Sequence, residues 1–213
     1  MKNARIIIVE DDAFTRTTLA EALKHSGLNI VAAVGTAREA IAAQSELSPD
    51  AAVLDLDLGV GPTGIDVAHA FRANNPDIGI VMLTSFRDPR LANPNLPPLP
   101  PGAIFLNKRE LESVAALAIQ ITAVLVNPHT RRLMPWAKRS TFTGLSSTQI
   151  EIMRAVADGF TTNEIAKQRG VTEQAVEKTV ARICANLNIP KSSDKNQRVQ
   201  IVRAFFHGAG REI

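Results

Sequence analysis

The sequence has little of several residue types that mark whole classes of protein: one cysteine, one tryptophan and no tyrosine among 213 residues. The single Cys184 excludes an internal disulfide framework and a cysteine-based zinc cluster, and we expect it to be a small buried apolar residue. No apolar run approaches the roughly 18 residues of a membrane-spanning helix. The apolar run at residues 6–9 is too short for a signal peptide and is followed at once by acids. We therefore expect a cytoplasmic protein with no membrane partner.

Charge is distributed unevenly along the chain. Residues 1–126 carry 10 Lys and Arg against 14 Asp and Glu, a net charge of −4, whereas residues 127–213 carry 14 against 7, a net charge of +7. An acidic half joined to a basic half indicates two tasks, the second of which involves a polyanion.

The acidic half alternates short apolar runs with helical patterns. The runs lie at residues 6–9, 30–34, 51–58, 78–83 and 103–106, and the helical patterns at residues 14–26, 36–48, 65–75 and 109–125. This alternation predicts an α/β fold with helices on both faces of a parallel sheet. The flavodoxin-like strand order 2-1-3-4-5 would place the binding edge between the first and third strands.

Polar side chains follow several of these predicted strands. Glu10 and Asp11 follow the first, Asp55 the third, Thr84 the fourth and Lys108 the fifth. Three carboxylates at one sheet edge suit Mg²⁺, which prefers oxygen ligands. A hydroxyl and an ammonium beside them suit a phosphoryl group, with Asp55 as the nucleophile that forms an aspartyl-phosphate.

Residues 5 to about 125 resemble the receiver domain of two-component response regulators. The resemblance is carried by Glu10-Asp11 with Arg16 behind them, by Pro49-Asp50 leading to Asp55, by Thr84, and by the run from Phe105 to Lys108. The alternative is a phosphatase or phosphotransferase similar to the haloacid dehalogenases, because Asp55-Leu56-Asp57 resembles the DxD motif of that family. In that family, however, the DxD strand comes first and the paired acids come last.

The receiver resemblance implies a role for each matching residue. Asp11 and Asp55 would ligate Mg²⁺ directly, Glu10 would act through water, and the backbone carbonyl of Asp57 would complete the protein ligands. Phe105 stands where the family has an aromatic switch residue that turns inward when Thr84 engages the phosphoryl group. Phosphate would come from a sensor histidine kinase.

The sequence departs from receivers between the fourth and fifth predicted strands. Residues 89–101 contain six prolines in thirteen residues, which cannot sustain the α-helix that receivers have there. We expect an extended or polyproline II segment in place of helix 4. The loop after Asp55 is also one residue longer than the common family pattern.

The basic half predicts a linker and four helices. Residues 127–141 indicate an interdomain linker with basic side chains. Helix starts are marked by Ser146, Thr161, Thr172 and Ser193, and helix ends by Gly159 and Gly170. A short helix, a glycine turn and a longer helix form a helix-turn-helix, whose second helix enters the DNA major groove.

Residues 145–189 resemble a LuxR-type DNA-binding domain. The carriers are Leu145-Ser146, the run from Glu151 to Met153, the run from Gly159 to Thr161, the run from Glu164 to Ala166, and Val171 to Glu173 before Val176. Together the two resemblances imply a NarL/FixJ-class response regulator. Its domains would be a receiver over residues 1–126, a linker over 127–141 and a DNA-binding domain over 142–213.

The third helix of this domain would face DNA. With Val176, Val180, Ile183 and Leu187 inward, its outward residues are Gln174, Glu177, Lys178, Ala181 and Arg182. The family's base-reading positions fall on Glu177, Lys178 and Ala181, and Glu177 departs from the usual basic residue. Lys178 and Arg182 are the candidates for guanine or phosphate contact.

The sequence therefore predicts a transcription regulator, and not an enzyme apart from the chemistry of its own phosphorylation. Phosphorylation of Asp55 would control binding to a double-stranded DNA operator. Phe205 and Phe206 in the last helix would form either a homodimer surface or part of the core. The alternative is a regulator that binds DNA independently of phosphorylation and is controlled through protein contacts at the proline-rich segment.

Overall fold

The chain divides into two compact units, which are described separately. The computed structural model describes residues 4–93, 96–130, 142, 144–192 and 194–210. The first unit comprises Met1–Ser85 and Pro97–Pro135, and the second comprises Phe86–Leu96 and Trp136–Ile213. A segment from the middle of the first half therefore belongs to the second unit. Most of the predicted linker, residues 131–141, lies outside the described residues.

The first unit is built on a five-stranded parallel sheet. Its strands are β1 (Arg5–Val9), β2 (Asn29–Val34), β3 (Ala51–Leu54), β4 (Gly79–Thr84) and β5 (Ile104–Asn107). The order β2-β1-β3-β4-β5 confirms the predicted flavodoxin-like topology. The apolar run at residues 51–58 extends four residues beyond β3, which ends at Leu54, directly before Asp55 as predicted. Its neighbour β1 ends at Val9, opposite Leu54, so the chain is free to leave the sheet at Asp55.

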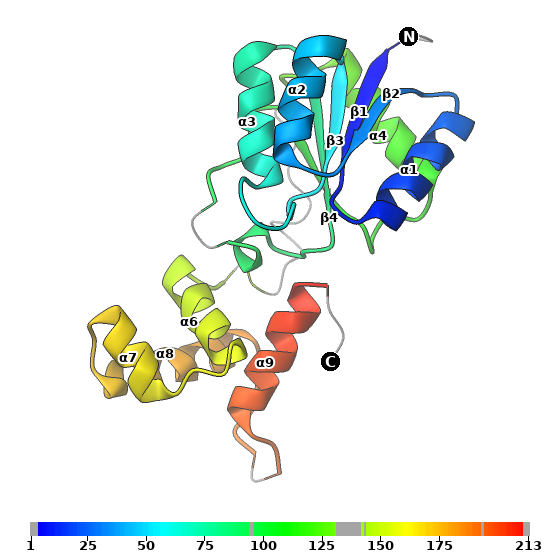
Figure 1. Ribbon diagram of the computed structural model, residues 1–213. Coiled ribbons are helices and arrows are strands. Elements are labelled where there is room, and N and C mark those ends of the chain that lie inside the picture. Colours follow the sequence, from blue (N-terminus) through cyan, green and yellow to red (C-terminus); the bar gives the residue numbers. More distant parts are fainter. Residues whose placement is uncertain (1–3, 94–95, 131–141, 143, 193, 211–213) are drawn as a thin grey trace. The chain divides into compact units, whose positions relative to one another are not determined.

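Helices cover both faces of the sheet (Figure 1). They are α1 (Ala13–His25), α2 (Ala37–Leu47), α3 (Gly64–Asn74) and α4 (Val114–Val126). The helices α2 and α3 lie on one face, and α1 and α4 on the other. The predicted capping box at Thr36 is present. The last helix begins at Val114 and not at residue 109, because the side chain of Ser113 accepts the N–H of Ala116 and caps it.

The core beneath α1 and α4 explains the apolar runs in the sequence. Alternate residues of β1, β3 and β4 face these helices, and the intervening residues are buried against the opposite face. Strands buried on both faces contain almost only apolar residues, as the sequence indicated. The cluster comprises Ile6, Ile8, Ala20, Leu23, Ala51, Val53, Val81, Leu83, Ile104, Leu117, Ile121 and Val124.

The connection between β4 and β5 has no α-helix among its described residues. This confirms the prediction that helix 4 is replaced. The start of the connection differs from an extended segment, because Pro89–Leu91 form a 3₁₀ turn, η1. Proline is tolerated at the first position of a helical turn, where its missing N–H costs nothing. The side chain of Asp88 caps this turn by accepting the N–H of Arg90.

The second unit contains four described helices, as predicted. They are α6 (Ser147–Ala157), α7 (Thr162–Arg169), α8 (Glu173–Asn186) and α9 (Gln197–Gly208). Thr161 and Thr172 cap α7 and α8, and Gly170 ends α7 with a φ of 64°. The start of α9 was predicted too early, since its cap is Asn196, which accepts N–H groups from Arg198 and Val199. Ser193 lies outside the described residues.

The inward residues of this unit form its core. Val176 and Ile183 of α8 are fully buried, and Cys184 is buried beside them as expected. Phe205 is buried as well, with its ring in an edge-on contact with Phe206 at 5.7 Å. Phe205 therefore belongs to the core, and only Phe206 is partly accessible. Within the described part of the chain, no helix has the length and apolar character to cross a bilayer.

Candidate functional site

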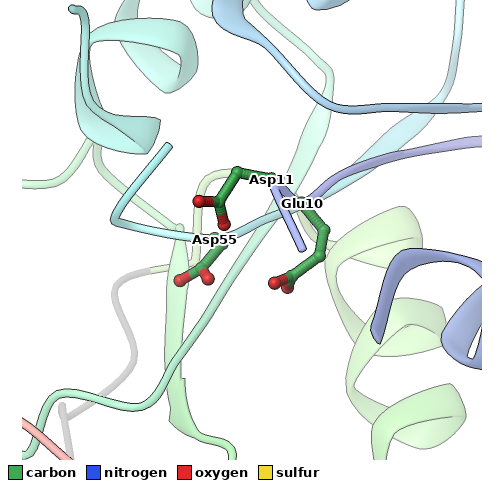
Figure 2. Close-up of side chains that lie close together, drawn as sticks. All are labelled: Glu10, Asp11 and Asp55. Carbon is green, nitrogen blue, oxygen red and sulfur yellow. The ribbon is translucent and has the colours of Figure 1, made fainter. Parts of the chain in front are cut away.

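Three carboxylates meet at the carboxyl edge of the sheet. Glu10 and Asp11 follow β1, and Asp55 follows β3, the strand paired with β1. One oxygen of each carboxylate lies within 4.8 Å of the others. Figure 2 shows the three side chains directed toward a shared space. The parallel topology therefore brings together acids that are about 45 residues apart in the sequence.

Lys108 offsets the charge of this cluster. It follows β5, and its Nζ lies 2.5 Å from Oε2 of Glu10 and 2.8 Å from Oδ2 of Asp55. Its own backbone N–H donates to the carbonyl of Thr84 at 2.8 Å. The cation is thus held between two strand ends and paired with two buried acids, which is the arrangement in which an ion pair resists solvent screening.

The neighbouring carboxylates nevertheless repel one another. Burial, together with the negative charge of Asp55, raises the pKa of Glu10 from 4.5 to about 7, although Lys108 acts in the opposite direction. Burial alone would lower the pKa of Lys108, but the charges and hydrogen bonds of Asp55 and Glu10 outweigh it and raise that pKa. A divalent cation among the three carboxylates would relieve this repulsion, so the donor set fits a hard metal ion.

Backbone hydrogen bonds and the close approach of Gly64 fix the position of Asp55. Oδ1 of Asp55 accepts the N–H of Leu56 at 2.6 Å, and the N–H of Asp55 donates to Val9 at 2.8 Å. Gly64 lies against this turn, where a Cβ would fall 1.8 Å from the carbonyl oxygen of Asp55. Only glycine fits there. The loop after Asp55 must therefore fold back over its own carbonyl.

Arg16 holds the acidic turn from the other side. Its Nη1 donates to the backbone carbonyls of Glu10 at 2.6 Å and of Asp11 at 3.1 Å. Asp12 caps α1 by accepting the N–H of Thr15 at 2.7 Å. Sequence reasoning used Arg16 only as a family marker and missed this role. An arginine one turn into the helix that follows an acidic strand end is the signal that indicates it.

The remaining predicted residues of this site differ in exposure. Thr84 is fully buried at the end of β4, and Phe105 is buried within β5. Asp57 is exposed, and its carboxylate accepts the N–H of Gly59 at 3.3 Å. The structure thus brings Glu10, Asp11, Asp55 and Lys108 into one cluster. It places Asp57 in the loop two residues beyond Asp55.

A second candidate site lies on α8. Its predicted outward residues are all exposed, namely Gln174, Glu177, Lys178, Ala181 and Arg182. They share one face because Val176 and Ile183, on the opposite face, are buried in the core. The side-chain face that could enter a DNA groove is therefore free in this unit.

Contacts between helices hold α8 in place within the second unit. The Nδ2 of Asn163 in α7 donates to Oε1 of Glu173 at 2.6 Å, at the first turn of α8. Arg198 of α9 donates to the hydroxyl of Thr162 at 3.1 Å and to the carbonyl of Phe160. These bonds connect the first turn of α7 with both following helices.

Comparison with known families identifies two domains, the first of which includes residues 86–96, although that segment groups with the second unit of the structure. Residues 6–96 match the response regulator receiver domain. Residues 143–202 match the luxR family of bacterial regulatory proteins. The receiver match ends within the proline-rich segment, so Lys108 lies beyond it and is supported by its geometry alone.

Individual proteins similar to this chain match it over most of their own length. The oxygen regulatory protein NreC of Staphylococcus epidermidis is 26% identical over 199 residues, covering 87% of this chain and 91% of NreC. The transcriptional regulatory protein LnrK of Bacillus subtilis is 23% identical over 202 residues, covering 87% and 91%. RcsB from Salmonella enterica serovar Typhimurium, solved bound to the promoter rprA, has the same fold, with a TM-score of 0.56, 16% identity, and coverage of 95% and 98%.

Proposed function

The chain belongs to the response regulators, with a receiver domain joined to a LuxR-type DNA-binding domain, and we propose that phosphorylation of Asp55 controls its DNA binding. The chain is a DNA-binding regulator of transcription. The observation that carries the proposal is the cluster of Glu10, Asp11 and Asp55, with Lys108 paired to two of the three acids.

Asp11 and Asp55 would hold Mg²⁺ directly, Glu10 through water, and Asp57 through its backbone carbonyl. The ion would neutralise the phosphoryl oxygens as charge moves onto them. An Asp55 carboxylate oxygen attacks phosphorus while the bond to the histidine nitrogen of a sensor kinase breaks, and that nitrogen leaves with the electron pair. Lys108 then pairs with a phosphoryl oxygen, because it already lies 2.8 Å from Oδ2 of Asp55.

Thr84 and Phe105 would form the switch. Thr84 ends β4 beside the strand that carries Asp55, so its hydroxyl would donate to a phosphoryl oxygen on that side chain. Phe105 is buried on the neighbouring strand β5. Movement of Thr84 would make room for the ring, which couples the chemistry at Asp55 to the fold.

The exposed face of α8 would read DNA in the major groove. Lys178 and Arg182 would contact guanine or phosphate, and Glu177 would accept from a cytosine amino group. Gln174 and Ala181 complete the face. A homodimer would place two such helices on the two halves of an operator. A regulator of this kind acts on DNA in the cytoplasm.

One observation favours regulation without phosphorylation as a second candidate. The segment in place of helix 4 is a proline-rich connection with only a 3₁₀ turn among its described residues. This removes the helix through which receivers usually pair. In that case protein contacts at this segment would replace the phosphate signal.

The deciding experiment compares Asp55→Asn with Asp57→Asn, which removes the same charge two residues away. After incubation with acetyl phosphate and Mg²⁺, a phosphate-affinity gel should retard the wild type and Asp57→Asn but not Asp55→Asn. Circular dichroism should show that both variants keep the wild-type fold. Retardation of Asp55→Asn would refute the assignment of the phosphoacceptor, and no retardation of any protein would favour the second candidate.

A further inference from the structure

We propose that residues 86–93, at the start of the connection between β4 and β5, form a docking segment built into the DNA-binding unit. Through it, the state of Thr84 reaches helices α6 and α9. The segment lies between two receiver strands in the sequence, yet it groups with the second unit and not with the first. The signalling part of this proposal rests on the proposed function, whereas the docking part stands on contacts alone.

A buried ion pair anchors the segment. Asp88 is 0% exposed and accepts from Nε of Arg90 at 3.0 Å and from Nη2 at 2.8 Å. The same guanidinium donates to the carbonyl of Leu145 at 2.6 Å and to that of Phe142 at 2.8 Å. Both carbonyls precede α6. Because arginine has a planar fork of donors, one side chain can bind the carboxylate and both carbonyls at once.

Two further contacts join the segment to α6 and α9. Leu91 is buried, and its carbonyl accepts from Nη2 of Arg154 in α6. The N–H of Arg87 donates to the carbonyl of Gly208, at the end of α9, at 2.8 Å. A Cβ on Gly208 would lie 2.5 Å from the ring of Phe142 and 2.6 Å from Leu91. Leu91 of the docking segment and Phe142 therefore leave no room for a side chain at Gly208, the last residue of α9.

Docking leaves the DNA-reading face open. The hydrogen bonds described for the segment go to Phe142, Leu145, α6 and the end of α9, whereas Lys178 and Arg182 on α8 are exposed. The segment is thus not a cover over the recognition helix. Its influence on DNA binding must pass through α6 and α9, which both pack against α8.

The covalent path from the phosphorylation site to this segment is short. Thr84 is the last residue of β4, and Phe86 is the first residue of the docking segment. The intervening Ser85 is tied to β5, since its carbonyl accepts from Nδ2 of Asn107 at 3.3 Å. Because only one residue separates Thr84 from the docking segment, a displacement of Thr84 moves Phe86 as well. The movement then reaches the residues of the segment that bind α6.

The docking part is tested with Arg90→Ala in the full chain by amide hydrogen exchange. Exchange in residues 145–157 and 200–209 should rise about tenfold, because the anchoring bonds are lost. Exchange in β1 and β3 should stay unchanged. Arg87→Ala is the matched control, since it removes the same charge from the segment but keeps the backbone bond to Gly208. Unchanged exchange in residues 145–157 of Arg90→Ala would overturn the docking.

If Arg90→Ala fails to fold, Arg90→Lys replaces it. Lysine keeps a positive charge beside the buried Asp88 but cannot reproduce the forked bonds. The same rise in exchange over residues 145–157, of smaller size, is expected. Wild-type exchange in this variant would likewise overturn the docking.

The signalling part is tested by repeating the exchange with acetyl phosphate and Mg²⁺. Wild type should change its exchange in residues 145–157 on phosphorylation, and Arg90→Ala should lose that change although a phosphate-affinity gel shows that it is still phosphorylated. An equal change in both proteins, or none in phosphorylated wild type, would overturn the signalling route. Absence of phosphorylation in wild type would instead refute the proposed function, leaving the docking to be decided by exchange without phosphate.

Discussion

The acidic edge of the sheet and the outer face of α8 are both charged, but they are built in opposite ways. At the sheet edge, Glu10, Asp55 and Lys108 come from three strands and are largely buried. On α8, Lys178 and Arg182 come from one helix and are exposed. The first set is held by contacts among its members, and the second only by the helix beneath it.

This difference in construction decides what each region can do. Burial and the neighbouring charge of Asp55 raise the pKa of Glu10, and a metal ion among these carboxylates can relieve that perturbation. Exposed charges on a helix remain available to a polyanion. The sheet edge should therefore be sensitive to single substitutions and to pH, and the helix face to salt.

The largest effect is expected at Gly64. Gly64→Ala would drive a Cβ against the carbonyl of Asp55, which should cost about 3 kcal/mol of the free energy of unfolding and block phosphorylation. Gly59→Ala is the control, because Gly59 has a φ of +78° but nothing within 4 Å of its Cβ position. It should cost only about 1 kcal/mol. Urea unfolding followed by circular dichroism measures both, and equal midpoints would contradict the close approach.

The next effect concerns pH at Glu10. Its pKa rises from the ordinary 4.5 of a glutamate to about 7 in the fold, so the folded chain holds a proton between these values that the unfolded chain has lost. The energetic cost of the carboxylate is therefore absent below pH 4.5 and complete above about pH 7.

Without Mg²⁺, the free energy of unfolding should accordingly fall on the order of 2 kcal/mol between pH 5 and pH 8. Urea unfolding in chelator at several pH values measures this fall. Glu10→Gln should flatten it, and Mg²⁺ should reduce it in the wild type. A fall of the same size in Glu10→Gln would assign it to another group.

A smaller effect is expected on the helix face. Lys178→Ala combined with Arg182→Ala should weaken binding to double-stranded DNA about tenfold at fixed salt and reduce the salt slope by about 2. Lys191→Ala combined with Lys195→Ala removes the same charge from exposed positions before α9. Fluorescence anisotropy over a salt series compares the pairs. Equal losses would mean that net charge, and not the α8 face, binds DNA.

The smallest effect is expected at the start of α8. Thr172 caps this helix by accepting the N–H of Ala175 at 3.2 Å, so Thr172→Ala should cost about 1 kcal/mol in thermal or urea unfolding. Thr179→Ala, in the middle of the same helix, should be neutral or slightly stabilising, since alanine favours helices. A larger loss in Thr179→Ala than in Thr172→Ala would show that packing and not capping supports α8.

Local pattern was enough for most of the fold. The apolar runs predicted all five strands, because strands buried on both faces of a parallel sheet contain almost only apolar residues. The strand order was predicted from the flavodoxin-like fold, and the structure has that order. Helix starts at Thr36, Ser146, Thr161 and Thr172 were predicted from side chains that cap within three residues. The errors fell at residue 109 and Ser193, where the actual caps, Ser113 and Asn196, lie further along the chain.

The two candidate sites also differ in how far the sequence predicted them. The exposed face of α8 could be predicted in full, because a helix of known phase determines which side chains point outward. For the sheet edge, the residue types and the strand ends were predictable, but Arg16 and Gly64 were missed. Arg16 bonds carbonyls only five and six residues before it, so its position in the first turns of α1 was an available signal. The role of Gly64 depends on how closely the loop after Asp55 approaches the Asp55 carbonyl, which no local pattern encodes.

By itself, the sequence determined the five strands, most of the helix caps and the replacement of helix 4, since these follow from short-range periodicity, capping and proline chemistry. Only the tertiary structure decided that Lys108 pairs with both Glu10 and Asp55. It likewise decided that Asp88 and Arg90 lie in the second unit and that Arg90 binds the residues before α6. These contacts join residues more than 50 positions apart, and their formation depends on packing that the whole chain creates at once.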